Sequence, residues 1–213
     1  MKKKFIDPNI KNKSKTVEDN IQLYMFNGQE LPLPTEIEIS ESGTCNRTCS
    51  FCPRSAANFI DKKEFITNKL HEKLCIELKE LNYKGTIRYS GFVEPMLDKN
   101  IFNLINMVRN YLPESNIEMV TNGDPLNLKR LKKLFESGLN KILISAYDGK
   151  EESDKLEDLC IQANLTEKQY IVRHRYYSED QDFGITLSNR SGLMTDAEFK
   201  IDALKEPLKK HCY

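Results

Sequence analysis

Three cysteines in one short segment are the residues of this sequence that most clearly could do chemistry. Cys45, Cys49 and Cys52 are separated by three and then by two residues. Thiolates are soft ligands that select zinc, copper(I) or iron–sulfur clusters over hard cations. A four-iron cluster usually has four thiolate ligands, so three thiolates leave one iron open to a small molecule. The alternative is a structural zinc site completed by His71 or Cys75, although the sequence has no second C-x2-C pair.

The spacing C-x3-C-x2-C, with Phe51 directly before the last cysteine, resembles the radical S-adenosylmethionine superfamily. The resemblance implies that the three cysteines bind a [4Fe–4S] cluster whose fourth iron is chelated by the amino and carboxylate groups of S-adenosyl-L-methionine. It predicts an enzyme that cleaves S-adenosylmethionine reductively. The resulting 5′-deoxyadenosyl radical would abstract a hydrogen atom from a polar substrate, and a small electron-transfer protein would be the reductant.

Two further segments carry the resemblance. Gly91-Phe-Val-Glu-Pro95 is similar to a glycine-rich motif that holds the methionyl amino group, with Val93 where glycine is usual. Thr121-Asn-Gly123 is similar to a turn common in the family. Without the cysteines, both segments would be interpreted as ordinary surface turns.

Side chains at two later strand ends complete the predicted site. The resemblance places Ser145 near the ribose or carboxylate of S-adenosylmethionine, although a serine at a strand end is often a helix cap. Arg173 and Arg175 are candidates to bind a carboxylate with their guanidinium groups, or to pair with Glu38 or Glu118. The predicted cofactor-binding residues are Phe51, Gly91, Glu94, Thr121, Asn122, Ser145 and Arg173.

The elements that must position these residues alternate along the chain. Alternation of strands and helices predicts parallel βα units. Strands are expected over 35–40, 86–90, 117–121, 141–145 and 170–175, with helices over 67–81, 98–110, 127–136 and 151–163, and a looser β-like stretch over 183–187. The predicted fold class is α/β, a partial (βα)6 TIM-like barrel of parallel strands with outer helices.

The strands alternate between apolar and polar side chains. Glu38, Arg88, Glu118 and Arg173 fall on the polar side and are expected to share one concave face. A closed eight-stranded barrel has an apolar interior, so the pattern favours an open barrel with a polar lumen. Cys75 and Cys160 are expected in the core, and His174 on the helix-facing side.

Composition limits the class of protein. The chain has 213 residues with 32 Lys plus Arg and 32 Asp plus Glu, so its net charge is zero. This balance argues against nucleic-acid or membrane binding. No apolar run is long enough to span a membrane and no signal peptide is evident. Six cysteines in such a chain indicate reduced thiols and a cytoplasmic location.

Three regions are expected. Residues 1–34 form an N-terminal extension, in which the apolar patch 21–26 is expected against the domain edge. Residues 35–188 form the radical S-adenosylmethionine core. Residues 189–213 resemble the bridge to an auxiliary-cluster (SPASM) domain that is expected to be missing, with Cys212 as its first ligand. That subgroup modifies peptides or proteins and also acts on small molecules. The alternative function is a non-catalytic metal or iron–sulfur binding module.

Overall fold

The computed structural model describes Pro8 and residues 21–202. The predictions for residues 1–20 and for Cys212 lie outside these described residues. The expected alternation of strands and helices is confirmed from residue 36 onward.

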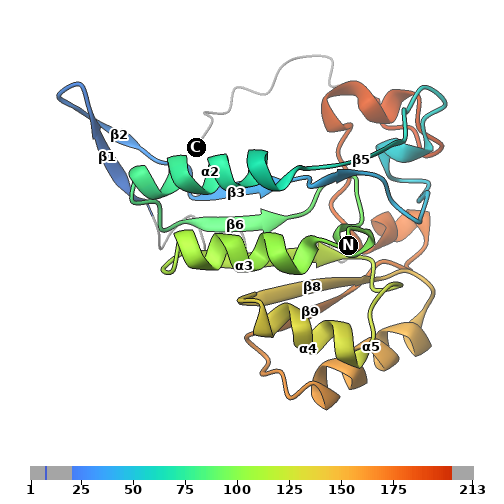
Figure 1. Ribbon diagram of the computed structural model, residues 1–213. Helices are drawn as coiled ribbons and strands as arrows, with labels where there is room; N and C mark the ends of the chain where they lie inside the picture. The colour runs from blue at the N-terminus through green and yellow to red at the C-terminus, as the bar shows by residue number, and fades with distance from the viewer. Residues whose placement is uncertain (1–7, 9–20, 203–213) are drawn as a thin grey trace.

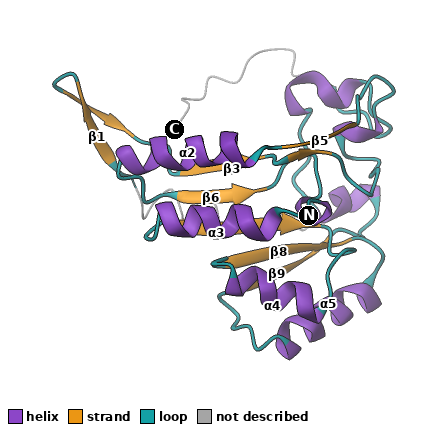
Figure 2. Ribbon diagram, in the orientation of Figure 1, coloured by secondary structure: helices purple, strands orange, loops and turns teal. Residues whose placement is uncertain are grey.

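A five-stranded parallel sheet forms the centre of the molecule, in the order β3-β6-β7-β8-β9 (Figure 1). The strands are β3 (Glu36–Ile39), β6 (Thr86–Tyr89), β7 (Asn116–Thr121), β8 (Lys141–Ala146) and β9 (Tyr170–His174). The connecting helices are α2 (Asn68–Glu80), α3 (Ile101–Tyr111), α4 (Leu128–Glu136) and α5 (Lys150–Gln162), and they cover one face of the sheet. Figure 2 shows the loops that follow the strands gathered at the carboxyl end of the sheet. This arrangement confirms the prediction of a partial TIM-like barrel.

Helix starts follow from local capping. Thr67 precedes α2 and its hydroxyl accepts a hydrogen bond from the amide of Leu70 at 3.2 Å. Asn127 precedes α4 and accepts from the amide of Arg130 at 2.9 Å. Such caps satisfy amides that have no partner inside the helix.

The helix-facing side of the sheet is the hydrophobic core. Ile87, Ile117 and Ile142 point from successive strands into this layer and are fully buried, as is Leu104 of α3. Cys75 and Cys160 are buried in the same layer, as predicted. Burial of apolar surface here fixes the strand register, because a one-residue slip would turn these side chains to the polar side.

The polar side of the sheet is only partly as expected. Glu38, Arg88 and Glu118 are register partners on adjacent strands. Arg88 and Glu118 are almost completely buried, and the Arg88 guanidinium lies 2.6 Å from Glu118 and 2.7 Å from Glu36. The prediction of a wet lumen is therefore wrong at this end of the strands, where an ion-pair network replaces solvent. Alternation of apolar and polar side chains along the strands cannot by itself distinguish a solvated polar face of the sheet from a buried, ion-paired one.

Residues 183–187 do not form the expected β-like stretch. A 3₁₀ segment occupies Glu179–Gly184, and no strand follows it among the described residues up to 202. Asp182 and Phe183 have positive φ angles of 55° and 51°, which are incompatible with an extended strand. The described residues therefore contain five parallel strands rather than six.

Only part of the apolar patch 21–26 contacts the domain edge. The Gln22 side chain donates to the Asn82 carbonyl at 2.6 Å and accepts from the Lys84 amide at 3.0 Å. The large apolar side chains are each more than half exposed, namely Ile21, Leu23, Met25 and Phe26. Strand β1 (Leu23–Phe26) pairs with β2 (Gln29–Pro32) in a hairpin that projects from the sheet (Figure 1). Asn27 and Gly28 at its tip both have positive φ angles, as the favoured two-residue hairpin turn requires. Within residues 21–202, no helix is long and apolar enough to cross a membrane.

Candidate active site

A cavity of about 370 Å³ opens at the carboxyl ends of the strands. All ten residues predicted to bind metal or cofactor contribute to its wall. The predicted residues on the wall are Cys45, Cys49, Cys52, Phe51, Gly91, Glu94, Thr121, Asn122, Ser145 and Arg173. The position agrees with the rule that sites of βα barrels form from the loops after the strands.

The three cysteines lie in the loop between β3 and α2, after the two-residue strand β4 (Ser42–Gly43). They are half-buried free thiols. The amide of Cys52 donates to the carbonyl of Cys49 at 2.9 Å, which makes the second half of the loop a tight turn. Burial, together with the charges of the neighbouring thiols, raises the pKa of Cys49 to about 11. A bound metal would reverse this effect, since metal ligation deprotonates a thiol.

The spread of the sulfur atoms argues against a mononuclear zinc site. Among the described residues, only Asp124, Asp148 and Glu152 form a set of three potential ligands whose ligand atoms all lie within 4.8 Å of one another. The three cysteine sulfurs are not such a set, so at least one pair of them is more than 4.8 Å apart. A tetrahedral zinc with Zn–S bonds of about 2.3 Å would hold its sulfurs only about 3.8 Å apart. A larger cluster, with one thiolate on each of three irons, fits the wider arrangement.

The two residues considered as a fourth zinc ligand lie away from the cysteine loop. His71 and Cys75 are buried on α2, on the helix side of the sheet. The Nε2 atom of His71 lies 2.8 Å from the Tyr89 hydroxyl, and burial lowers the pKa of this histidine to about 4. Neither residue lines the cavity. The zinc alternative with a fourth ligand from α2 is therefore excluded by position.

Glu94 has a structural role that the sequence did not reveal. Its buried carboxylate accepts three hydrogen bonds: from the Thr121 hydroxyl at 2.7 Å, the Asn122 amide at 2.7 Å and the Met96 amide at 2.9 Å. The side chain thus ties the loop after β6 to the end of β7. A carboxylate has about four acceptor sites, so one site on Oε2 remains for a ligand.

Gly91 is required by a close contact. Its φ angle is +130°, and a Cβ atom at this position would lie 2.1 Å from the Ser40 hydroxyl oxygen. Val93 is not among the residues with positive φ. The departure from the usual glycine pattern therefore causes no backbone strain at Val93.

Aromatic side chains close one side of the cavity. Phe51 stacks on Tyr147 at a centroid distance of 6.1 Å and contacts Phe183 at 5.0 Å. Tyr147 was missed in the sequence, although it follows Ser145 by two residues. The rings of Phe51 and Tyr147 line the cavity and give it an apolar wall next to the cysteines, and Phe183 packs behind Phe51.

The two arginines of β9 differ in position. Arg173 lines the cavity and is the register partner of Ser145. Arg175 is buried, and its Nη1 atom donates to the Gly184 carbonyl at 2.6 Å. Arg175 therefore holds the 179–184 segment in place in addition to lining the cavity. His174 stacks on Tyr176 at 5.3 Å, in agreement with the prediction of a packed residue.

Comparison with known proteins agrees with this geometry. The model of the Radical SAM superfamily matches residues 39–179. The S-adenosyl-L-methionine-dependent 2-deoxy-scyllo-inosamine dehydrogenase of Niallia circulans is 31% identical over 74% of this chain and 60% of its own length. The GTP 3′,8-cyclase of Aquifex aeolicus (strain VF5) is 30% identical over 56% of this chain and 38% of its own length.

A solved structure shares the architecture. The crystal structure of BtrN in complex with AdoMet and 2-DOIA matches with a TM-score of 0.61 and 28% identity, over 76% of this chain and 62% of that one. The chain thus spans less than two thirds of the length of these relatives. Because the family model covers most of the sheet and all three cysteines, the chain belongs to the Radical SAM superfamily.

Proposed function

We propose that the chain is the core of a radical S-adenosylmethionine enzyme. Cys45, Cys49 and Cys52 would hold a [4Fe–4S] cluster, and S-adenosylmethionine would occupy the adjoining cavity. A single observation carries this proposal: three widely spread, half-buried thiols open onto a cavity of about 370 Å³, and no fourth cysteine or histidine of the described residues lines that cavity.

When bound, the cluster supplies the electron that cleaves the sulfonium C–S bond of S-adenosylmethionine to methionine and a 5′-deoxyadenosyl radical. The protein supplies binding, orientation and exclusion of water. The free acceptor site of Glu94 suits an ammonium group, and the guanidinium of Arg173 suits a carboxylate. The stacked rings of Phe51 and Tyr147 offer an apolar surface that suits a purine and keeps water away from a radical.

The proposed substrate is polar, and a small molecule is favoured over a peptide. Support comes from the charged and hydroxyl side chains on the cavity wall, including Glu38, Ser40 and Arg173. Further support comes from the relative that is named for an inosamine substrate. Modification of a peptide or protein stays a proposal that rests on the likeness of residues 189–213 to a SPASM bridge.

The proposal also covers the reductant, the location and the cofactor ligands. The reductant is a small electron-transfer protein, because the cluster needs a one-electron donor. The enzyme acts in the cytoplasm, where thiols stay reduced. The S-adenosylmethionine ligands are the predicted residues of the cavity wall.

The test is reductive cleavage in the absence of oxygen. The full chain is reconstituted with iron and sulfide, reduced, mixed with S-adenosylmethionine and assayed for 5′-deoxyadenosine. We expect product from the wild type and from Cys160→Ser, and none from Cys49→Ser. A colourless protein that binds one zinc would contradict the proposal. A chain that holds the cluster but forms no product with any reductant would favour the alternative of a non-catalytic iron–sulfur module.

A further inference from the structure

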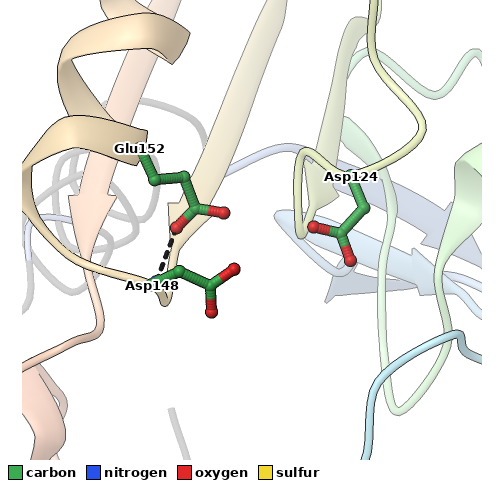
Figure 3. A group of neighbouring side chains, drawn as sticks. All are labelled: Asp124, Asp148 and Glu152. Atoms are coloured by element: carbon green, nitrogen blue, oxygen red, sulfur yellow. Dashed lines mark hydrogen bonds between the residues drawn. The ribbon is translucent and has the colours of Figure 1, made fainter.

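Arg47, inside the cysteine loop, has an unusual set of partners. Its guanidinium forms bidentate ion pairs with two carboxylates: Nε and Nη2 lie 2.7 and 2.5 Å from Asp124, and Nη1 and Nη2 lie 2.8 and 2.7 Å from Asp148. Nη2 also lies 3.3 Å from Glu152. Figure 3 shows Asp124 on one loop, Asp148 on a second loop and Glu152 on the helix that follows it, with the three carboxylates facing one space.

The three acids lie in the connections that follow two neighbouring strands. Asp124 follows β7, and Asp148 follows β8. Glu152 lies in the first turn of α5, and its carboxylate also accepts from the amides of Tyr147 and Asp148 at 2.5 and 2.7 Å. Each acid is thus held at the carboxyl end of the parallel sheet, so Arg47 joins the cysteine loop to the segments that follow β7 and β8.

A second set of contacts extends this attachment to a cysteine. Asn46 donates to Asp124 at 2.6 Å and accepts from the Asn122 side chain at 2.7 Å. The same amide nitrogen of Asn122 lies 3.8 Å from the Cys45 sulfur. The guanidinium also lies over the ring of Tyr147, 5.1 Å from its centroid. Arg47 therefore contacts the loops after β7 and β8, and both loops carry residues of the cavity wall, Asn122 and Tyr147.

The group of three acids is not a cation site in this structure, because the Arg47 guanidinium fills it. The Arg47 side chain is 19% exposed. Its charge holds the pKa of Asp148 below the usual range. Charge-assisted, bidentate pairs of this kind fix geometry more strongly than a single neutral hydrogen bond.

We propose that Arg47 is a positioning residue that clamps the cysteine loop onto the turns after β7 and β8, so that the three thiols are held ready for the cluster before it binds. The link to catalysis rests on the proposed function. The clamp itself is a property of the cluster-free chain. Lysine cannot replace it fully, because an ammonium group lacks the planar fork that contacts two carboxylates at once.

The first test is hydrogen–deuterium exchange of the full chain without the cluster. In Arg47→Ala, we expect amides of residues 45–52 to exchange about tenfold faster, the effect of losing one charge-assisted hydrogen bond. Arg47→Lys should give an intermediate rate. The buried amides of β6 serve as the internal reference. Asp154→Asn is the matched control, because Asp154 lies on α5 and pairs with Lys150 rather than Arg47.

The second test is cluster retention. After reconstitution, loss of the visible cluster absorption in a chelator should be about tenfold faster in Arg47→Ala than in the wild type. Arg47→Lys should be intermediate and Asp154→Asn unchanged. Asp124→Asn should be more severe than Asp148→Asn, because Asp124 also binds Asn46.

The outcomes separate the two proposals. An unchanged exchange rate in residues 45–52 of Arg47→Ala would overturn the proposed clamp. An equal rise in the exchange rate of the β6 amides would also overturn it, because it would indicate only a loss of global stability. If the wild type takes up no iron but the exchange results are as expected, the clamp stands and the proposed function fails. If the exchange results are as expected and iron is bound with equal retention in all variants, the proposed role of the clamp in holding the cluster is overturned.

Discussion

Replacement of Glu94 by glutamine tests the link between the loop after β6 and the end of β7. The carboxylate receives the Thr121 hydroxyl and the Met96 amide on Oε1, and the Asn122 amide on Oε2. Glutamine keeps the shape but turns one of these oxygens into an NH₂ group. In either orientation of the new amide, this donor faces one of the two backbone amides, which also donate.

The cost follows from burial. Glu94 is 1% exposed, so water cannot replace the lost acceptor. A buried donor left without a partner costs about 1–3 kcal/mol. For a chain of this length, that corresponds to a fall in Tm of roughly 3–9 °C. Asn122 should also shift, because its backbone amide loses or weakens the bond that fixes it beside Cys45.

The assay is thermal unfolding of Glu94→Gln beside Glu80→Gln, a control at an exposed position on α2. The control should unfold at the wild-type temperature. Cluster retention in a chelator provides the second measurement, and Glu94→Gln should lose the cluster faster. An unchanged Tm would refute the reasoning, because it would mean that the three hydrogen bonds to Glu94 do not hold the loop in solution.

Three further predictions concern other parts of the molecule. Burial raises the pKa of Glu41 to about 7 from an ordinary 4.5, so the folded state binds its proton more tightly and loses stability as pH rises between these values. The stability of Glu41→Gln relative to the wild type should therefore increase with rising pH, by about 3 kcal/mol at pH 8. Chemical denaturation at several pH values measures this difference. A difference in unfolding free energy that does not change with pH would contradict the prediction. Glu118→Ala should destabilise the protein by about 1.5–3 kcal/mol, because it removes one of the two carboxylates that pair with the buried Arg88 guanidinium and leaves Glu36 as the remaining partner. The exposed Glu77→Ala should cost much less, and equal costs in denaturant titrations would refute the buried network. Cys49→Ser should abolish iron–sulfur absorption on reconstitution while Cys75→Ser retains it; retention in both would exclude Cys49 as a ligand.

The sheet was predictable because its signals are local and repeated. Alternating runs such as residues 117–121 mark strands, and the caps Thr67 and Asn127 mark helix starts. The carboxyl ends of parallel strands meet at one edge, so residues as far apart in the sequence as Cys45 and Arg173 could be placed around one cavity.

Other features depend on tertiary contacts that the sequence pattern does not encode. The alternating residues 183–187 fit a strand, but the positive φ angle of Phe183 prevents one. The acids around Arg47 lie in two loops and in the first turn of α5, and only the three-dimensional geometry of these segments brings them together. The role of Glu94 in joining the loop after β6 to the end of β7 likewise could not be predicted, because it depends on where the structure places its three hydrogen-bond donors.

Metal and sulfide content of the anaerobically reconstituted full chain tests the central claim most directly. Three thiolates spread around one cavity predict about four iron and four sulfide per chain. Substitution of Cys45, Cys49 or Cys52 by serine should reduce that content sharply, while substitution of Cys160 should not. One zinc per chain with no sulfide, unaffected by loss of Cys45, would contradict the account.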